Sequence, residues 1–478
     1  MKRLNADIYT KKKRPIRVLQ FGEGNFLRAF IDYIINEMNK TNEFSSNVVV
    51  VQPLSTGRIE DLRAQDGLYT LFLEGIDQSM VVKKHEIIDC LDDFINPYQD
   101  YEGFLNYGKS KDLRFIISNT TEAGIVFDPT DIKHDQTPKS FPGKLLALLK
   151  YRFDYFNGAK DKGLHIIPCE LIDNNGDKLK KVLVELSILL NYDQVFIDWL
   201  TNNNYFYNTL VDRIVPGYPK DEAHSIQSTL GYIDTSMVKG EIFHLWVIED
   251  HYGLVNEFIV PPYLNVKFVE DVNPYREQKV KILNGSHTCM TPIGYLAGIN
   301  TVKDTVNDEV IGLLIKNYIY DEVIPTLNLP KKEMIAFASS VLERYQNPFI
   351  VHELMSIALN SMSKYKTRVL PSVLDNLNKG KFPKYGLFSL ASLIVFYRGK
   401  RNEELIALQD NPEFLSMFNS LWQTYDGSDE SVKKIIKTVL ALEHWECDLL
   451  SYPNVLSFLT MSVNKILQRP IKEVIKEL

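Results

Sequence analysis

Residues 17–30 read RVLQFGEGNFLRAF, and this stretch decides the fold. Its first five residues are typical of a short buried strand, and Gly22-Glu23-Gly24 follows at once, so a tight turn can aim backbone amides at a pyrophosphate. Apolar residues then recur at helical spacing from Phe26. Residues 47–51, NVVVV, indicate a second buried strand. Strand, glycine turn, helix and strand form a βαβ unit of the dinucleotide-binding kind.

The dinucleotide fingerprint is incomplete in this chain. Leu27 stands where the third glycine is usual, and the second strand ends in Gln52-Pro53 instead of a carboxylate. These residues do not decide between NAD and NADP as the cofactor, because Arg58 can be read as a phosphate partner or as a solvated loop charge. An ordinary turn is the alternative to a cofactor site. The cofactor contacts predicted from this unit are Phe21, Gly22, Gly24, Asn25, Phe26 and Gln52.

Two polar loops follow further strands of the predicted sheet. Residues 67–75 and 114–118 have strand character, and SNTTEAG at 118–124 then leaves the sheet where open α/β sheets bind ligands. Thr121, Glu122 and Gly124 are therefore candidates for the nicotinamide side of the site, although a plain polar connection explains them equally well. The strand-like run from Leu164 ends similarly, in Asn174-Asn175-Gly176.

The predicted secondary structure changes near residue 272. Before it, β-like runs such as 241–248 and 266–269 alternate with helices; after it, amphipathic helical patterns dominate. We expect an α/β fold, with a Rossmann-type domain with additional strands over 1–272 and an all-α, or at least mostly α-helical, substrate and catalytic domain over 273–478. The helical patterns cover 310–324, 332–343, 350–362, 388–397, 431–442 and 455–467.

The second domain opens with a reactive combination, KVKILNGSHT at 279–288. On an α-helix of about 100° per residue, Lys279, Asn284 and His287 lie at roughly 0°, 140° and 80°, on one side of the axis. An amine that exchanges a proton, an amide that polarises a carbonyl and an imidazole that holds a hydroxyl suit hydride exchange between an alcohol and a ketone. The plain alternative is a set of surface and capping residues.

Composition narrows the class of protein. The 478 residues carry a formal net charge of -7, which disfavours nucleic acid and anionic membranes as partners, and Lys11 to Arg14 is expected to be a solvated arm. Four scattered cysteines suit a reducing cytoplasm, and neither a signal peptide nor a membrane-spanning run is found. No HExxH or His pair at zinc spacing occurs, so we expect catalysis without a metal. The oligomeric state stays open.

Several separate segments resemble the polyol-specific long-chain dehydrogenases, the mannitol dehydrogenase group. They occur in the family's order from about residue 16 to about residue 450, so the resemblance covers nearly the whole chain. The matching segments are FGEGNFLRAF, SNTTEAG, IPCELIDNNG, LVDRIVPGYP, KILNGSHT and NPFIVHELMSIALN.

The resemblance implies an NAD-dependent oxidoreductase that uses no metal. The family's general acid/base lysine falls on Lys279, its two oxyanion-stabilising asparagines fall on Asn284 and Asn175, and His287 is implied to orient the substrate. The members that it resembles most reduce tagaturonate reversibly to altronate, in hexuronate catabolism. Fructuronate or a hexitol of the mannitol type are the alternative substrates, and a catalytically silent dinucleotide sensor is the alternative of another class.

The resemblance also suggests residues that contact the substrate. Asp212 matches a family signature, with a structural pairing to Arg213 as the alternative, and Lys364 matches a substrate-side lysine. Ser356 and Arg276 replace an arginine and a glutamate of the mannitol enzymes, which is compatible with an acid substrate. A carboxylate needs a cation, for which Lys364, Arg368 and His352 are the candidates, with Arg276 as a further one.

Overall fold

The computed structural model describes residues 1–41, 43–120, 123–131, 136–401 and 403–478. It divides into two compact units, Met1–Gly75 with Val81–Val272 and Ile76–Met80 with Asn273–Leu478. In the described part of the chain, no helix combines the length and the apolar character that crossing a membrane demands.

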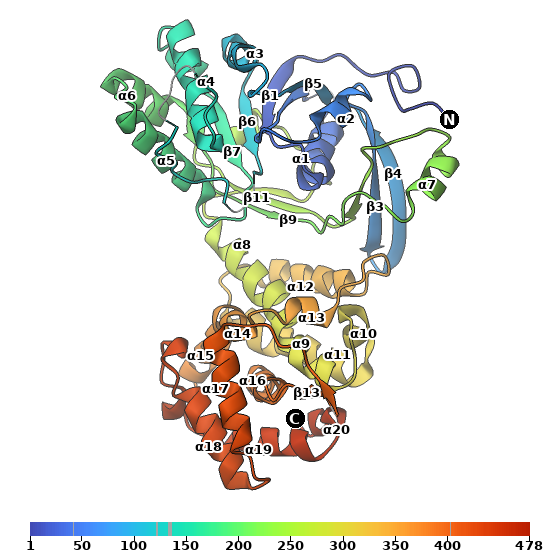
Figure 1. Cartoon of the computed structure of the whole chain (residues 1–478), viewed down its shortest axis with the longest axis vertical. Coiled ribbons are helices and arrows are strands. Elements are labelled where there is room, and N and C mark those ends of the chain that lie inside the picture. The colour runs from blue at the N-terminus through green and yellow to red at the C-terminus, as the bar shows by residue number, and fades with distance from the viewer. Residues whose placement is uncertain (42, 121–122, 132–135, 402) are drawn as a thin grey trace. The chain divides into compact units, whose positions relative to one another are not determined.

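The first unit is built on a parallel sheet of six strands (Figure 1), in the order β5-β2-β1-β6-β7-β8. The chain fills one side of β1 first and then the other, so the strand order reverses between β1 and β6. That switch point is where open α/β sheets bind ligands. The strands are β1 Ile16–Phe21, β2 Asn47–Val51, β5 Leu91–Ile95, β6 Phe115–Ser118, β7 His165–Pro168 and β8 Tyr205–Phe206.

Both faces of this sheet are covered, which explains its continuous apolar strands. Along β1, Val18 packs into the core beside α1, and Leu19 and Phe21 pack into a second core on the opposite face. The helices of this unit are α1 Asn25–Met38, α2 Ile59–Arg63, α3 Tyr101–Asn106, α4 Phe141–Tyr155, α5 Asn175–Leu189, α6 Gln194–Asn203 and α7 Ala223–Leu230.

Two smaller sheets share the core of α1, in the orders β10-β3-β4 and β12-β11-β9. As a result α1 is buried all round from Leu27 to Met38, where the sequence pattern alone suggests a helix with a single apolar face. The predicted strand over 241–248 is two strands. The bounds are β3 Tyr69–Asp77, β4 Met80–Ile88, β9 Thr209–Asp212, β10 Val238–Glu241, β11 Leu245–Glu249 and β12 Val266–Val269.

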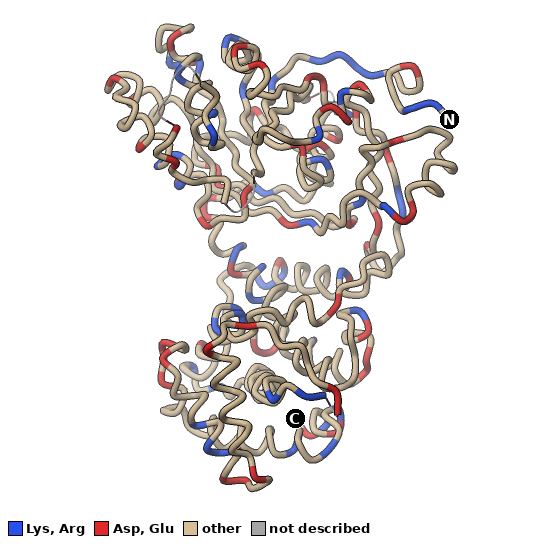
Figure 2. Tube along the Cα trace, in the orientation of Figure 1, with Lys and Arg blue, Asp and Glu red and all other residues tan. Residues whose placement is uncertain are grey.

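The basic N-terminal segment is not the solvated arm that its composition predicts. Figure 2 shows it as an extended stretch of basic residues within the first unit. Arg14 pairs with the buried Asp89 at 3.1 Å, and Lys11 lies 3.7 Å from Asp92. Only Lys12 and Lys13 of the four are exposed. Lys11 and Arg14 therefore fasten the segment beside β5, while Lys12 and Lys13 face solvent.

The second unit is mostly helical, as predicted, although a short hairpin of β13 Lys400–Arg401 and β14 Glu404–Leu405 makes it not entirely α. Its central helix is α16, which is apolar on every side and packs against α9 and α19. The other helices include α8 Asn273–Gln278, α9 Gly285–Leu296, α10 Val302–Asn307, α11 Glu309–Asn317, α12 Lys331–Tyr345, α15 Leu370–Asn378, α16 Lys384–Phe396, α17 Pro412–Gln423, α18 Asp429–Leu440, α19 Val455–Gln468 and α20 Ile471–Ile475.

The prediction of one helix over 350–362 is wrong. Only α13, Leu354–Ile357, is helical there, and α14 begins at Ser361 and ends at Arg368. Asn360 between them has a φ of 54°, a left-handed conformation that no helix interior tolerates. The break re-aims α14, which carries Lys364 and Arg368, against α9.

Candidate active site

The glycine turn after β1 needs its first glycine. Gly22 has a φ of +124°, and a Cβ there would lie 2.8 Å from Leu27 Cδ1 and 3.1 Å from the Asn119 carbonyl oxygen. The Gly22 amide donates to the Val51 carbonyl at 3.0 Å, which ties the turn to β2. Gly22 therefore lets the turn lie close against the loop that leaves β6, at the switch point of the sheet.

The N-terminus of α1 can receive an anion. Gly24 is its N-cap residue, and a Cβ placed there would have no neighbour within 4 Å. Among the described residues no side chain caps this helix, and the Asn25 carboxamide oxygen accepts from Arg28 Nη2 at 2.6 Å instead. Free amides at a helix N-terminus fit the pyrophosphate of a dinucleotide.

The other residues predicted to contact the cofactor are held by the protein itself. The Phe21 ring is fully buried and lies 4.9 Å from the Phe141 ring, so only its backbone borders the turn. Phe26 stacks on Phe30 at 5.0 Å, and the buried Gln52 donates to the Leu54 carbonyl at 2.9 Å. Contact of these residues with a cofactor stays a prediction.

A buried glutamate that the sequence interpretation missed holds the loop after β6. Glu170 accepts from the Thr120 amide at 3.0 Å, from the Thr120 hydroxyl at 2.9 Å and from the Ser118 hydroxyl at 3.0 Å. Burial raises the pKa of Glu170 above its ordinary value. Its position just beyond the end of a buried strand, after Cys169, was the available signal. The predicted contacts Thr121 and Glu122 lie outside the described residues, and at Gly124 a Cβ would overlap the Thr120 hydroxyl.

Asn175 begins α5 and is fully buried. Its Nδ2 lies within 3.1 Å of three acceptors, the carbonyls of Pro168 and Glu170 and the Thr209 hydroxyl. Its Oδ1 accepts from the Thr209 amide at 2.9 Å. Asn175 therefore joins β7 to β9. Its predicted donation to an oxyanion would require one of these bonds to open, and that role stays a prediction.

Asp212 ends β9 and is buried, opposite Leu245 of β11. The neighbouring Arg213 guanidinium donates to the Phe243 carbonyl at 3.0 Å and lies over the Tyr33 ring at 4.7 Å. The Arg213 side chain therefore has a structural role in packing β9 against its neighbours. Contact of Asp212 with a substrate stays a prediction.

Lys279, Asn284 and His287 do not share an ordinary α-helix. Lys279–Asn284 is a π-helical turn between α8 and α9, and the Gly285 amide reaches back to the Val280 carbonyl. Fewer degrees per residue bring Lys279 and Asn284 closer on one face than the predicted 140°. Both are half-buried, and within the described part of the chain no hydrogen bond engages the Asn284 carboxamide. That amide is available to a ligand.

A tyrosine that the sequence interpretation also missed supports the π-helical turn. The Tyr345 hydroxyl, from α12, donates to the Leu283 carbonyl at 2.7 Å and contacts the Ser286 hydroxyl at 2.7 Å. Its ring lies 4.4 Å from the His287 ring, which in turn lies 5.0 Å from the His352 ring. Burial lowers the pKa of His352. The wide turn and the two imidazoles therefore form one packed group.

Two cations of α14 lie beside this group, because α14 packs on both the π-helical turn and α9. Lys364 donates to the Ile357 carbonyl at 2.8 Å, and burial together with the nearby Arg368 charge lowers its pKa. Arg368 is half-buried, and among the described residues no hydrogen bond or ion pair engages its guanidinium. A Cβ at Gly285 would lie 2.9 Å from the Arg368 carbonyl oxygen, so this glycine permits the close approach of α14. Ser356 is exposed.

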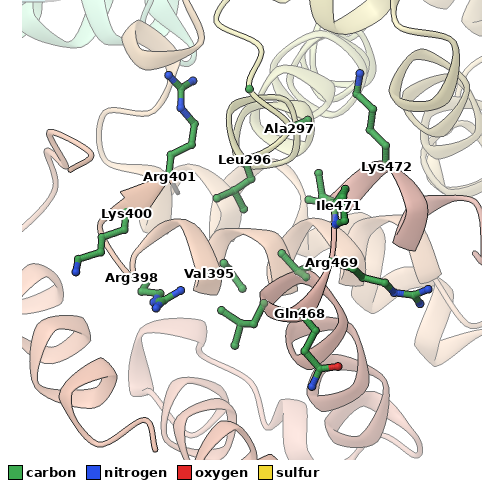
Figure 3. A pocket seen from close by; sticks show the side chains of 14 residues that line it. Leu296, Ala297, Val395, Arg398, Lys400, Arg401, Gln468, Arg469, Ile471 and Lys472 are labelled. Atoms are coloured by element: carbon green, nitrogen blue, oxygen red, sulfur yellow. The ribbon is translucent and has the colours of Figure 1, made fainter. Parts of the chain in front are cut away.

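A separate cavity of about 650 Å³ lies at the C-terminal ends of α9, α16 and α19 (Figure 3). None of the predicted site residues lines it. Three of its five cations have acidic partners: Arg401 lies 3.3 Å from Glu404, Arg469 lies 2.6 Å from Glu477, and Lys472 pairs with Asp308. Cations at helix C-termini also offset the partial negative charge of the helix ends. This cavity is thus no part of the site around Lys279.

Comparison with known proteins divides the chain at about the same place as the two compact units. Residues 16–257 match a family model described as the mannitol dehydrogenase Rossmann domain, and residues 271–467 match the mannitol dehydrogenase C-terminal domain. The chain belongs to the mannitol dehydrogenase family. This membership confirms the predicted fold class and the prediction of an oxidoreductase that acts on CH–OH groups.

Relatives within the family span the whole chain. An altronate oxidoreductase of Bacteroides thetaiotaomicron is 44% identical, covering 100% of this chain and 99% of its own. One of Klebsiella pneumoniae (strain 342) is 42% identical, covering 100% of both. A crystal structure of D-sorbitol dehydrogenase shares the fold, with a TM-score of 0.82 at 22% identity over 99% of this chain and 100% of that one.

Proposed function

We propose that this protein catalyses the reversible, NAD-dependent reduction of tagaturonate to altronate. Full-length relatives at 42% and 44% identity are named altronate oxidoreductase, which supports this substrate pair. The observation that carries the proposal within the structure is the half-buried Arg368, whose charge has no partner among the described residues. A partly desolvated cation is costly unless an anion binds it, and a uronate carboxylate is such an anion.

The π-helical turn provides the groups that act on the ketone. We assign Lys279 as the general acid that gives its proton to the carbonyl oxygen, and as the base in the oxidation of altronate. The free amide of Asn284 donates to the same oxygen and stabilises the charge that develops there. His287, held between Tyr345 and His352, orients a substrate hydroxyl.

The cofactor site belongs to the first unit. Gly22, Gly24 and the open N-terminus of α1 fit the pyrophosphate, and the loop held by Glu170 borders the switch point of the sheet. Bound NADH supplies the hydride. The four cysteines are free thiols, which supports a reducing cytoplasm as the place of the reaction.

Initial rates of NADH oxidation with tagaturonate, fructuronate and fructose test this assignment. We expect the highest kcat/KM with tagaturonate and a low one with fructose, which has no carboxylate for Arg368 and Lys364. Fast turnover of fructuronate or fructose, with none of tagaturonate, would refute the substrate. NADH binding without turnover of any of the three would favour a silent dinucleotide sensor.

A further inference from the structure

The loop after β2 lacks the acid that usually selects NAD. In a dinucleotide-binding βαβ unit, a carboxylate at the end of the second strand accepts from the 2′-hydroxyl of the adenosine ribose. Here Gln52 occupies that position, and its amide donates to the Leu54 carbonyl at 2.9 Å. An uncharged, inward-bonded side chain neither repels a 2′-phosphate nor provides a charged acceptor. The preference for NAD therefore needs another source.

A carboxylate reaches this loop from the glycine turn instead. The Glu23 Oε1 accepts from the Arg58 amide at 3.4 Å, and a Cβ at Gly57 would overlap both the Glu23 carboxylate and the Gln52 carboxamide. Glycine at position 57 thus leaves the space that Glu23 fills. The carboxylate of Glu23 follows β1, whereas the usual acid follows β2, and it lies near the Gln52 carboxamide.

We propose that Glu23 is the specificity determinant that accepts from the adenosine ribose 2′-hydroxyl and repels the 2′-phosphate of NADP. The Glu23 carboxylate has acceptor capacity to spare, because among the described residues the Arg58 amide, at a long 3.4 Å, is the one hydrogen-bond donor to it from another residue. Among the described residues no cation forms an ion pair with it. The side chain is half-buried and therefore partly desolvated, and this burial raises the pKa of Glu23. In such surroundings its charge acts strongly on a nearby phosphate.

Arg58, the arginine of this loop, already forms an ion pair with Asp61. Arg58 Nε lies 2.8 Å from Asp61, and its Nη2 donates to the Thr235 carbonyl at 3.5 Å. Arg58 was the residue that could have bound a 2′-phosphate. Because Asp61 offsets the charge of Arg58, the Glu23 carboxylate determines the net charge near the ribose. A negative charge there favours the 2′-hydroxyl of NAD over the 2′-phosphate of NADP.

The test is the ratio of the dissociation constants of NADH and NADPH, measured by fluorescence titration without any sugar. For Glu23→Gln we expect NADH affinity to fall about tenfold and the NADPH-to-NADH ratio to move about 10- to 100-fold toward NADPH, from loss of a charge-assisted bond and of the repulsion. Because no sugar is present, the outcome does not depend on tagaturonate being the substrate.

Matched variants separate specificity from support of the fold. Glu60→Gln removes an exposed carboxylate of α2 that pairs with Arg63 at 3.3 Å, and should leave the ratio unchanged. Gly57→Ala should displace the Glu23 carboxylate and shift the ratio in the same direction as Glu23→Gln. An unchanged ratio in folded Glu23→Gln, or an equal loss of both cofactors, would overturn the proposal. Should Glu23→Gln fail to fold, the result with Gly57→Ala decides.

Discussion

At the scale of the residue, charge without a partner is the most informative feature of the second unit. Lys366 and Arg368 stand two residues apart on α14, yet Lys366 lies 2.7 Å from Glu446, whereas the Arg368 guanidinium has no such contact among the described residues. The family resemblance suggested Lys364, and the need of a carboxylate for a cation made Lys364 and Arg368 candidates together. The sequence could not distinguish a paired cation from an open one, because the pairing depends on segments far apart in the chain.

The charge of Arg368 should affect KM only for substrates that carry a carboxylate. We expect Arg368→Gln to raise KM for tagaturonate about 10- to 100-fold, as for a lost charged hydrogen bond, and to leave NADH affinity unchanged. Steady-state rates of the variant with tagaturonate and fructose measure this. Lys366→Gln, which removes a paired cation of the same helix, is the control. An equal loss with both sugars would contradict a carboxylate site.

Asp32 provides a second test at this scale. It lies fully buried in α1, and burial raises its pKa to about 7, although Tyr69 donates to it at 3.1 Å. The folded protein therefore holds this proton more tightly than the unfolded chain, so the stabilisation is complete below about pH 4 and is lost as the pH rises through about 7. Asp32→Asn should gain stability over the natural protein as the pH rises from 5 to 8. Urea unfolding at several pH values checks this, and a pH-independent difference would contradict it.

At the scale of the element, strands and turns were easier to predict than the shape of the segment that carries Lys279. The buried strands around β1 are short apolar runs bounded by turn residues, so local pattern suffices for them. The π-helical turn at Lys279–Asn284 depends on Tyr345, far away in sequence, and on Gly285 packing against the Arg368 carbonyl. The break at Asn360 was likewise missed, because the apolar pattern continues across that residue without a visible interruption.

The π-helical turn should depend on the Tyr345 hydroxyl. In Tyr345→Phe the buried Leu283 carbonyl loses its 2.7 Å donor, and we expect the free energy of unfolding to fall by about 1–3 kcal/mol. Because the turn carries Lys279 and Asn284, kcat should also fall while NADH affinity stays. Chemical unfolding and steady-state kinetics measure the two effects. Tyr385→Phe, whose hydroxyl accepts from Asn317 at 3.2 Å, is the control, and unchanged kcat in Tyr345→Phe would show that the turn needs no such support.

At the scale of the whole molecule, the groups proposed for cofactor binding and for proton transfer belong to different units, since the glycine turn is in the first and Lys279 in the second. NADH at a hundred times its dissociation constant should stabilise the folded chain by about 2.7 kcal/mol. Differential scanning calorimetry should therefore show NADH raising the Tm of the natural protein. In Gly22→Val, where a side chain would strike Leu27 and the Asn119 carbonyl, that rise should vanish. A rise of equal size in the variant would show that NADH does not bind at this turn.

The most direct measurement is the initial rate of NADH oxidation with tagaturonate, for the natural protein and for Lys279→Ala side by side, together with NADH affinity by fluorescence. General acid catalysis is worth about 10²- to 10⁴-fold. We predict rapid turnover by the natural protein, a loss of at least that size in Lys279→Ala, and the same NADH affinity in both. Equal rates in the two proteins, or no turnover of tagaturonate by the natural one, would contradict the account.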